Sequence, residues 1–81
     1  MTTWQWEAYG LDGDRMIVDT LTDPFAGTVG EAADMAMAQL MVRARPDFRR
    51  LAGWRVRAWV DGAEAWAYAD DWLRTVEAVG R

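Results

Sequence analysis

Residues 54–69 carry the pattern that most constrains how this chain can fold. Two alternating runs flank Asp61-Gly62, a dipeptide typical of a two-residue β-turn. A hairpin closed by this turn has one apolar face, which pairs Val60 with Ala63, Ala58 with Ala65, Val56 with Ala67 and Trp54 with Ala69. Its other face pairs Trp59 with Glu64, Arg57 with Trp66 and Arg55 with Tyr68. The competing interpretation is a helix from Ala63 to Val79, because alanine favours helices.

Residues 28–44 are expected to form the main helix. Thr28 and Glu31 have the spacing of a capping box, and Pro46 ends the segment because a residue before proline disfavours helical torsion angles. The helical period gathers one apolar face, which consists of Val29, Ala33, Ala36, Leu40 and Ala44, with Met37 beside them. Most of these side chains are small, so we expect the helix to lie close against a sheet.

A second apolar stripe lies among the polar residues of the opposite helix face. It includes Met35, Ala38 and Val42. A helix that is apolar on more than one side usually has a second neighbour. Either the C-terminal segment of the chain covers this stripe, or the stripe is an exposed contact for a partner, since methionine adapts to varied surfaces.

Residues 4–21 predict another hairpin. The run Trp4–Tyr9 alternates as a half-buried strand does, and Asp12-Gly13 is typical of a type I′ turn, whose two central residues need positive φ. The return strand runs from Arg15 to Leu21, although Gly10 and Asp14 would also allow a longer loop. The resulting register pairs Ala8 with Ile17, Trp6 with Asp19 and Trp4 with Leu21, which places these residues, apart from Asp19, on a plausible lid for the helix.

Two further segments are expected to pack against these elements. Phe25, in the connection between the first hairpin and the helix, is expected to tuck under that hairpin. One short helical turn in residues 46–52 would direct Phe48 and Leu51 inward and the arginines between them outward, with Gly53 ending it.

The end of the chain predicts a short helix and completes the fold class. Asp70 or Asp71 would cap a helix over residues 72–79, with Trp72, Leu73 and Val76 as its apolar positions and Gly80 ending it. The sequence therefore predicts a single α+β domain over residues 1–81, in the order ββαββα. Its antiparallel sheet consists of two hairpins, with the main helix packed across one face.

Five residue types that carry much of enzyme and metal chemistry are missing: His, Cys, Ser, Lys and Asn. Their absence removes Ser and Cys nucleophiles, imidazole bases, Schiff-base lysines and the common zinc ligands. A hydrolase would depend on carboxylates and would need a concave pocket that holds two of Glu7, Asp19, Glu64 and Asp70. A domain of 81 residues has little room for such a pocket beside a core, so we expect no enzyme, no cofactor and no small-molecule substrate.

The acidic clusters Asp12-Gly13-Asp14 and Asp70-Asp71 superficially suggest a cation site. Neither has the ligand number or spacing of an established calcium or magnesium loop. Turn and cap roles explain both, so we expect no metal.

Several features of the sequence favour a cytoplasmic protein. No run approaches the roughly 18 apolar residues of a membrane span, and the alternating N-terminal residues do not resemble a signal segment. The absence of cysteine fits a reducing compartment. All nine basic residues are arginine and fourteen residues are alanine, which is typical of a high-GC genome and favours a bacterial or phage origin.

The outer face of the second hairpin is the preferred binding site, because Trp, Tyr and Arg are the residue types that anchor interfaces. The predicted partner-binding residues are Arg55, Arg57, Trp59, Trp66 and Tyr68 on this face, and Met35 and Val42 on the helix stripe. The occupant would be a protein partner or a second copy of the chain in a homodimer. The alternative is a self-contained, solvent-facing ladder of cross-strand pairs.

The formal net charge of −4 is unevenly distributed: −6 over residues 1–42, +5 over residues 43–57 and −3 over residues 58–81. The basic block supports an alternative function, nucleic-acid binding through Arg43, Arg45, Arg49 and Arg50, joined by Arg55 and Arg57. Arg43 and Arg45 also complement the negative end of the helix dipole. Because the chain as a whole is acidic, we expect protein binding rather than nucleic-acid binding. The preferred prediction is a small non-catalytic protein-interaction domain, regulatory or structural, without a membrane partner.

Overall fold

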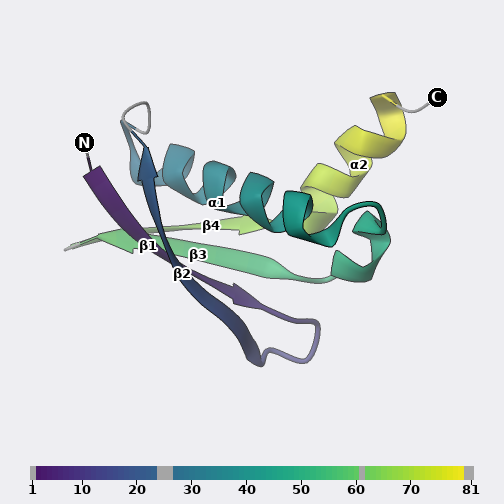
Figure 1. Cartoon of the computed structure of the whole chain (residues 1–81), viewed down its shortest axis with the longest axis horizontal. Coiled ribbons are helices and arrows are strands. Elements are labelled where there is room, and N and C mark those ends of the chain that lie inside the picture. The colour runs from purple at the N-terminus through teal and green to yellow at the C-terminus, as the bar shows by residue number, and fades with distance from the viewer. Residues whose placement is uncertain (1, 24–26, 61, 80–81) are drawn as a thin grey trace.

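A computed structural model of the chain describes residues 2–23, 27–60 and 62–79 (Figure 1). The elements follow in the order β1 (Thr2–Tyr9), β2 (Arg15–Asp23), α1 (Val29–Ala44), the 3-10 helix η1 (Phe48–Leu51), β3 (Arg55–Val60), β4 (Ala63–Tyr68) and α2 (Ala69–Val79). This order confirms the predicted ββαββα fold. Within the described ranges no helix is long and apolar enough to cross a membrane.

The four strands form one antiparallel sheet in the order β2-β1-β3-β4. The two hairpins meet where β1 pairs with β3, with Trp6 opposite Ala58 and Ala8 opposite Val56. The helix α1 lies across one face of this sheet, and none of the described helices covers the other face (Figure 1). The fold is therefore a two-layer arrangement with one uncovered sheet face.

The predicted register of both hairpins is confirmed. In the first hairpin Trp4 pairs with Leu21, Trp6 with Asp19 and Ala8 with Ile17. In the second, all six predicted strand pairs from Arg55–Tyr68 to Val60–Ala63 are present, and the Ala69 N–H donates to the Trp54 carbonyl at 3.0 Å. The helical interpretation of residues 63–68 is wrong because this segment pairs with β3.

The turn of the first hairpin differs from the prediction. Gly13 has a φ of +84°, but Asp12 does not have positive φ, so the type I′ turn is wrong. The Gly13 N–H donates to the Gly10 carbonyl and the Gly10 N–H donates to the Asp14 carbonyl, both at 3.0 Å. These bonds enclose a three-residue loop with glycine in the left-handed conformation. The register farther along the strands is kept because Met16 is an extra residue in β2.

The start of α1 is the predicted one. Thr28 is the N-cap residue, and its hydroxyl oxygen accepts the Glu31 N–H at 3.2 Å. The carboxylate of Glu31 reaches back to the Gly27 N–H at 3.4 Å, one residue before the position that a capping box usually satisfies. The helix ends at Ala44, before Pro46.

Small side chains bring α1 close to the sheet. The predicted helix face is buried except for Val29, which is partly buried, and the prediction missed the burial of Ala32 and Met41. On the sheet, Val56 and Ala58 of β3 and Ala67 of β4 face the helix with Trp6 of β1. The core between helix and sheet consists of the buried apolar residues Trp4, Trp6, Ala8, Leu21, Ala32, Ala33, Ala36, Met37, Leu40, Met41, Ala44, Leu51, Val56, Ala58, Ala67 and Ala69.

The helix α2 begins at Ala69, three residues earlier than predicted, because the chain passes from β4 into the helix without a loop. Asp70 and Asp71 therefore lie inside its first turn, and their predicted role as N-caps is wrong. The Asp70 carboxylate accepts the Gly53 N–H at 2.9 Å instead. Gly53 has a φ of +81°, a left-handed conformation that favours glycine at this corner.

The short helical turn is confirmed as η1, with Leu51 buried and Phe48 packed against the core. Trp72 and Leu73 of α2 are partly buried there, as expected. The predictions for Phe25, Gly80 and the side chain of Val76 lie outside the described residues.

The close helix–sheet contact predicts that Ala36→Leu is destabilising. Ala36 is fully buried, so the larger side chain must push α1 away from the sheet, at a cost of about 1–3 kcal/mol in the free energy of unfolding. Ala38→Leu on the outer side of the same helix should change this free energy by less than about 0.5 kcal/mol. Urea unfolding of both variants checks this, and equal losses would contradict the proposed packing.

Candidate functional site

The candidate site is the uncovered sheet face, called the open face below. Strand residues point alternately to the two sides of a sheet, so the neighbours of the buried core residues emerge on this face. The side chains of the open face include Glu7, Tyr9, Arg15, Val18, Arg55, Arg57, Trp59, Glu64, Trp66 and Tyr68.

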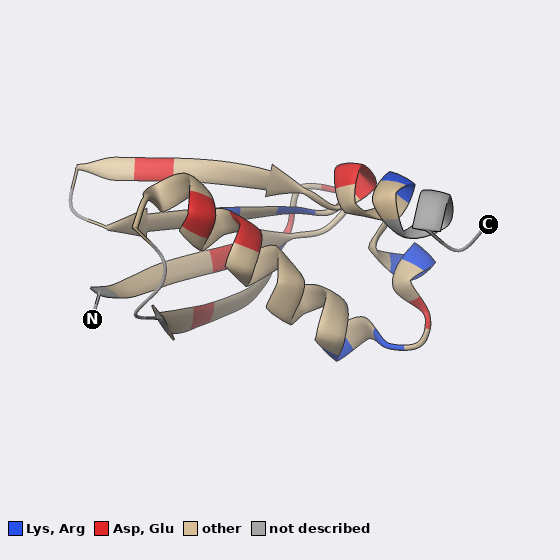
Figure 2. Cartoon of the chain, turned by 90° about the horizontal axis from the view of Figure 1, so that it is seen from above, with Lys and Arg blue, Asp and Glu red and all other residues tan. Residues whose placement is uncertain are grey.

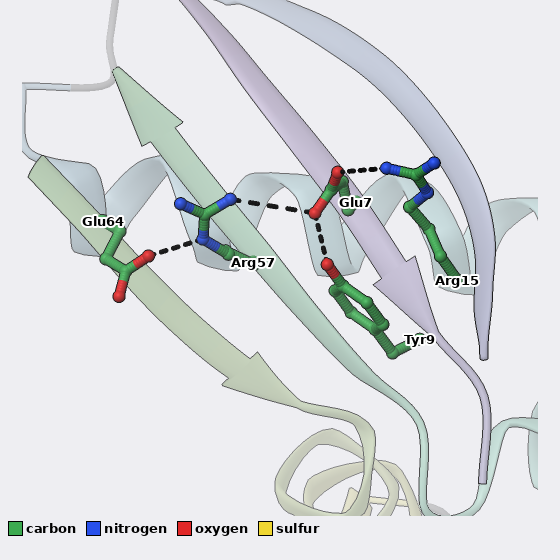
Figure 3. A network of polar contacts seen from close by, with 5 residues as sticks. All are labelled: Glu7, Tyr9, Arg15, Arg57 and Glu64. Carbon is green, nitrogen blue, oxygen red and sulfur yellow. Dashed lines mark hydrogen bonds and ion pairs between the residues drawn. The ribbon is translucent and has the colours of Figure 1, made fainter. Parts of the chain in front are cut away.

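Glu7 organises the polar contacts of the open face (Figure 3). This residue is only 7% exposed, and the Tyr9 hydroxyl donates to its carboxylate. Arg15, on β2, donates from Nη1 to Glu7 Oε1 at 3.1 Å. Arg57, on β3, places its Nη1 3.8 Å from Glu7 Oε2. The Arg57 Nε also donates to Glu64 Oε2 at 2.5 Å, so the network extends across all four strands.

The network shifts the protonation equilibria of its members. The hydrogen bond from Tyr9 holds the pKa of Glu7 below its ordinary value of 4.5, because this bond and the two arginines together outweigh the effect of burial. The same bond, together with burial, raises the pKa of Tyr9. The hydrogen bond to Glu64 raises the pKa of Arg57. Glu7 is therefore a fixed anion at neutral pH, on which three donors from three strands converge.

Aromatic rings and guanidinium groups stack beside this network. The Arg55 guanidinium carbon lies 5.6 Å from the ring centre of Tyr9 and 5.5 Å from that of Trp66, and these two rings are 5.6 Å apart. The Arg57 guanidinium carbon lies 4.4 Å from the ring of Trp59. These are cation–π distances. Trp66 remains 38% exposed and Tyr68 52% exposed, so the stacks leave aromatic surface in contact with solvent.

The predicted partner-binding residues fall on two opposite sides of the molecule. Those of the second hairpin lie together on the open face. Met35 and Val42 lie on α1, in the other layer, where Met35 is partly buried and Val42 is 63% exposed. The C-terminal helix packs against η1, and its Trp72 lines the same groove as Val42. One flat partner surface therefore does not contact both groups.

The predicted basic block is divided by the structure. Arg43 forms an ion pair with Asp19, and its guanidinium carbon lies 5.2 Å from the ring centre of Trp6. This contact lowers the pKa of Asp19. Arg45 follows α1 directly, and Arg49 and Arg50 are exposed on η1. Arg55 and Arg57 belong to the open face, so the six arginines do not form one patch.

The carboxylates considered for catalysis each have a structural contact. Glu7 and Glu64 share Arg57, Asp19 pairs with Arg43, and Asp70 accepts the Gly53 N–H. In the part of the chain that the structure describes, His, Cys, Asp and Glu side chains form no group of three or more able to hold a metal ion.

The prediction of the site missed the contribution of the first hairpin. Alternation in Trp4–Tyr9 already places Glu7 and Tyr9 opposite the core residues. Only the pairing of β1 with β3, which sequence periodicity does not specify, sets Glu7 beside Arg57 and Tyr9 beside Arg55.

Comparisons with protein-family models, with curated proteins and with solved structures give no match for this chain. The functional inference therefore rests on the geometry and chemistry of its own residues.

The network predicts that Glu7→Gln lowers the free energy of unfolding by about 1.5–3 kcal/mol at neutral pH, because the Tyr9 hydroxyl and two arginines lose a charged acceptor at a buried position. The pKa of Glu7 is lower in the folded state, so its stabilisation is fully present above a pH of about 4.5 and is lost as the pH falls through the folded-state pKa. The difference between wild type and variant should shrink accordingly in acid. Urea unfolding across this pH range measures it.

Glu64→Gln is the matched control for this experiment. It removes a carboxylate from the same network, but the side chain of Glu64 is half exposed, so the loss should stay below about 1 kcal/mol. Equal losses in the two variants, or a Glu7→Gln loss that does not change with pH, would contradict the central role of Glu7.

Proposed function

We propose that this chain is a small non-catalytic interaction domain that binds a protein partner through the open face of its sheet. The observation that carries the proposal is the exposure of Trp66 and Tyr68, beside Arg55, on a sheet face that none of the described helices covers. Aromatic residues and arginine are the types enriched at interfaces and at their energetic centres. Two such rings left in water are better explained by a binding role than by the stability of the fold.

Preorganisation of the open face supports this proposal. Glu7 holds Tyr9, Arg15 and Arg57 in the free chain, so fewer side-chain rotamers have to be fixed when a partner binds. A hollow of about 430 Å³ lies at the end of the second hairpin. It is lined by Arg57, Trp59, Val60, Gly62, Ala63 and Glu64, and would receive a side chain of the partner.

The charge of the open face favours a protein over a nucleic acid. Arg15 and Arg57 already contact Glu7, and Arg57 also contacts Glu64, so their charges are largely compensated within the domain. Binding to a phosphate backbone depends on cations that are available to neutralise phosphates. The proposal places the domain in the cytoplasm, in a regulatory or structural role. The absence of cysteine supports this location.

The proposal predicts that Trp66→Ala and Tyr68→Ala each weaken partner binding at least tenfold, because both remove exposed aromatic area of the open face. Immobilised wild-type chain and both variants are exposed to a lysate of cells that encode it, and the retained proteins are compared. Light scattering of the free chain shows whether the partner is a second copy, which the same substitutions would then dissociate.

Asp34→Ala is the control, because Asp34 is exposed on α1 in the other layer. It should retain the same proteins, or the same oligomeric mass, as the wild type. A monomer whose set of retained proteins is unchanged by Trp66→Ala and Tyr68→Ala would contradict the proposed function.

A further inference from the structure

A groove on the helical side of the molecule is not used by the open face. It measures about 340 Å³ and lies between the outer side of α1, η1 and the start of α2. Its lining consists of Ala38, Met41, Val42, Arg45, Phe48 and Trp72. Five of these six residues are apolar, and they come from three separate elements. We propose that this groove binds an acidic amphipathic helix of a protein partner.

The apolar lining is partly open to solvent. Val42 is 63% exposed, and Phe48 and Trp72 are partly buried at the margin of the core. The outer side of α1 needs a second neighbour according to its apolar pattern, and among the described side chains of α2 Trp72 lines the groove. An amphipathic helix has apolar residues at a spacing of three or four, which form one apolar face. This face can lie in an apolar groove such as the one beside α1.

The charge around the groove indicates the sign of the partner. Residues 43–52 contain four arginines and one acidic residue, Asp47, and Arg43 among them is paired with Asp19. Arg45 lines the groove itself, and Arg50 is exposed on η1. Figure 2 shows these basic segments gathered where α1 ends and η1 follows. Carboxylates that flank the apolar residues of a partner helix complement this rim.

The shape of the surface favours a helix over a nucleic acid. Much of the lining is aliphatic, with Ala38, Met41 and Val42 from α1. Single-stranded nucleic acid binds by stacking its bases on exposed aromatic platforms, and the most exposed of the described rings, Trp66 and Tyr68, lie on the open face in the other layer. Because the groove and the open face belong to opposite layers, this inference does not depend on the proposed function.

Fluorescence anisotropy with a designed probe tests the groove. The probe is a labelled peptide of about 16 residues, long enough to form a helix, with leucines at i, i+3, i+4 and i+7 and glutamates beside them. We expect saturable binding that weakens about tenfold when the glutamates are replaced by glutamine, and that falls with added salt.

Two matched variants locate the binding. Val42→Gln in the groove should weaken binding of the glutamate peptide about tenfold, and the fold should be kept because glutamine is a better helix former than valine. Val18→Gln is the control, since Val18 is 60% exposed but lies on the open face, and it should bind the peptide as the wild type does. The indole resonance of Trp72, assigned from Trp72→Phe, should shift on titration.

Each of four results would overturn the inference. The first is no saturable binding of the glutamate peptide, and the second is equal binding by the wild type and Val42→Gln. The third is displacement of the peptide by a single-stranded oligothymidine that binds Val42→Gln and wild type alike, which would assign the arginines to phosphate. The fourth is a dimeric mass in light scattering that Val42→Gln converts to a monomer, which would assign the groove to a second copy.

Discussion

The contact between α1 and the alanine-containing strands β3 and β4 is the interaction on which the rest of the structure depends. Ala33 and Ala36 of the helix and Ala58 of the sheet are buried with almost no exposed surface, so the two layers approach closely. The helix α1 lies across this sheet face and packs mainly on β3 and β4. None of the described helices covers the other face, which must therefore be stable in water.

Polar and aromatic contacts stabilise the open face in water. A buried carboxylate in the middle of a sheet would be costly alone, but Glu7 receives the Tyr9 hydroxyl and two guanidinium groups. Beside these contacts Arg55 stacks on the ring of Trp66, and Arg57 stacks on the ring of Trp59. The resulting surface is ordered without a covering layer. This is the physical reason to propose it as a binding surface, while the groove beside α1 is a separate surface on the opposite side.

Local patterns in the sequence predicted much of the fold and part of the site. Alternation sets which residues share a face, and the Asp-Gly turns set the centre of each hairpin, so the pairs Trp4–Leu21 and Trp59–Glu64 could be derived. Local patterns could not predict three other features, which are the loop before Asp14, the early start of α2 and the Arg43–Asp19 pair. These features depend on hydrogen bonds and packing between separate segments of the chain. The pairing of β1 with β3 is of the same kind, which is why Glu7 was missed as the centre of the site.

One sheet face is buried against α1, while the other presents aromatic rings to water. Fluorine NMR of the chain labelled with fluorotryptophan at all six tryptophans tests it, with a soluble paramagnetic agent as the probe of exposure. The account predicts strong broadening of the Trp66 resonance and little broadening of those of Trp4 and Trp6, which are buried between sheet and helix. Protection of Trp66 in the free monomer equal to that of Trp6 would contradict it.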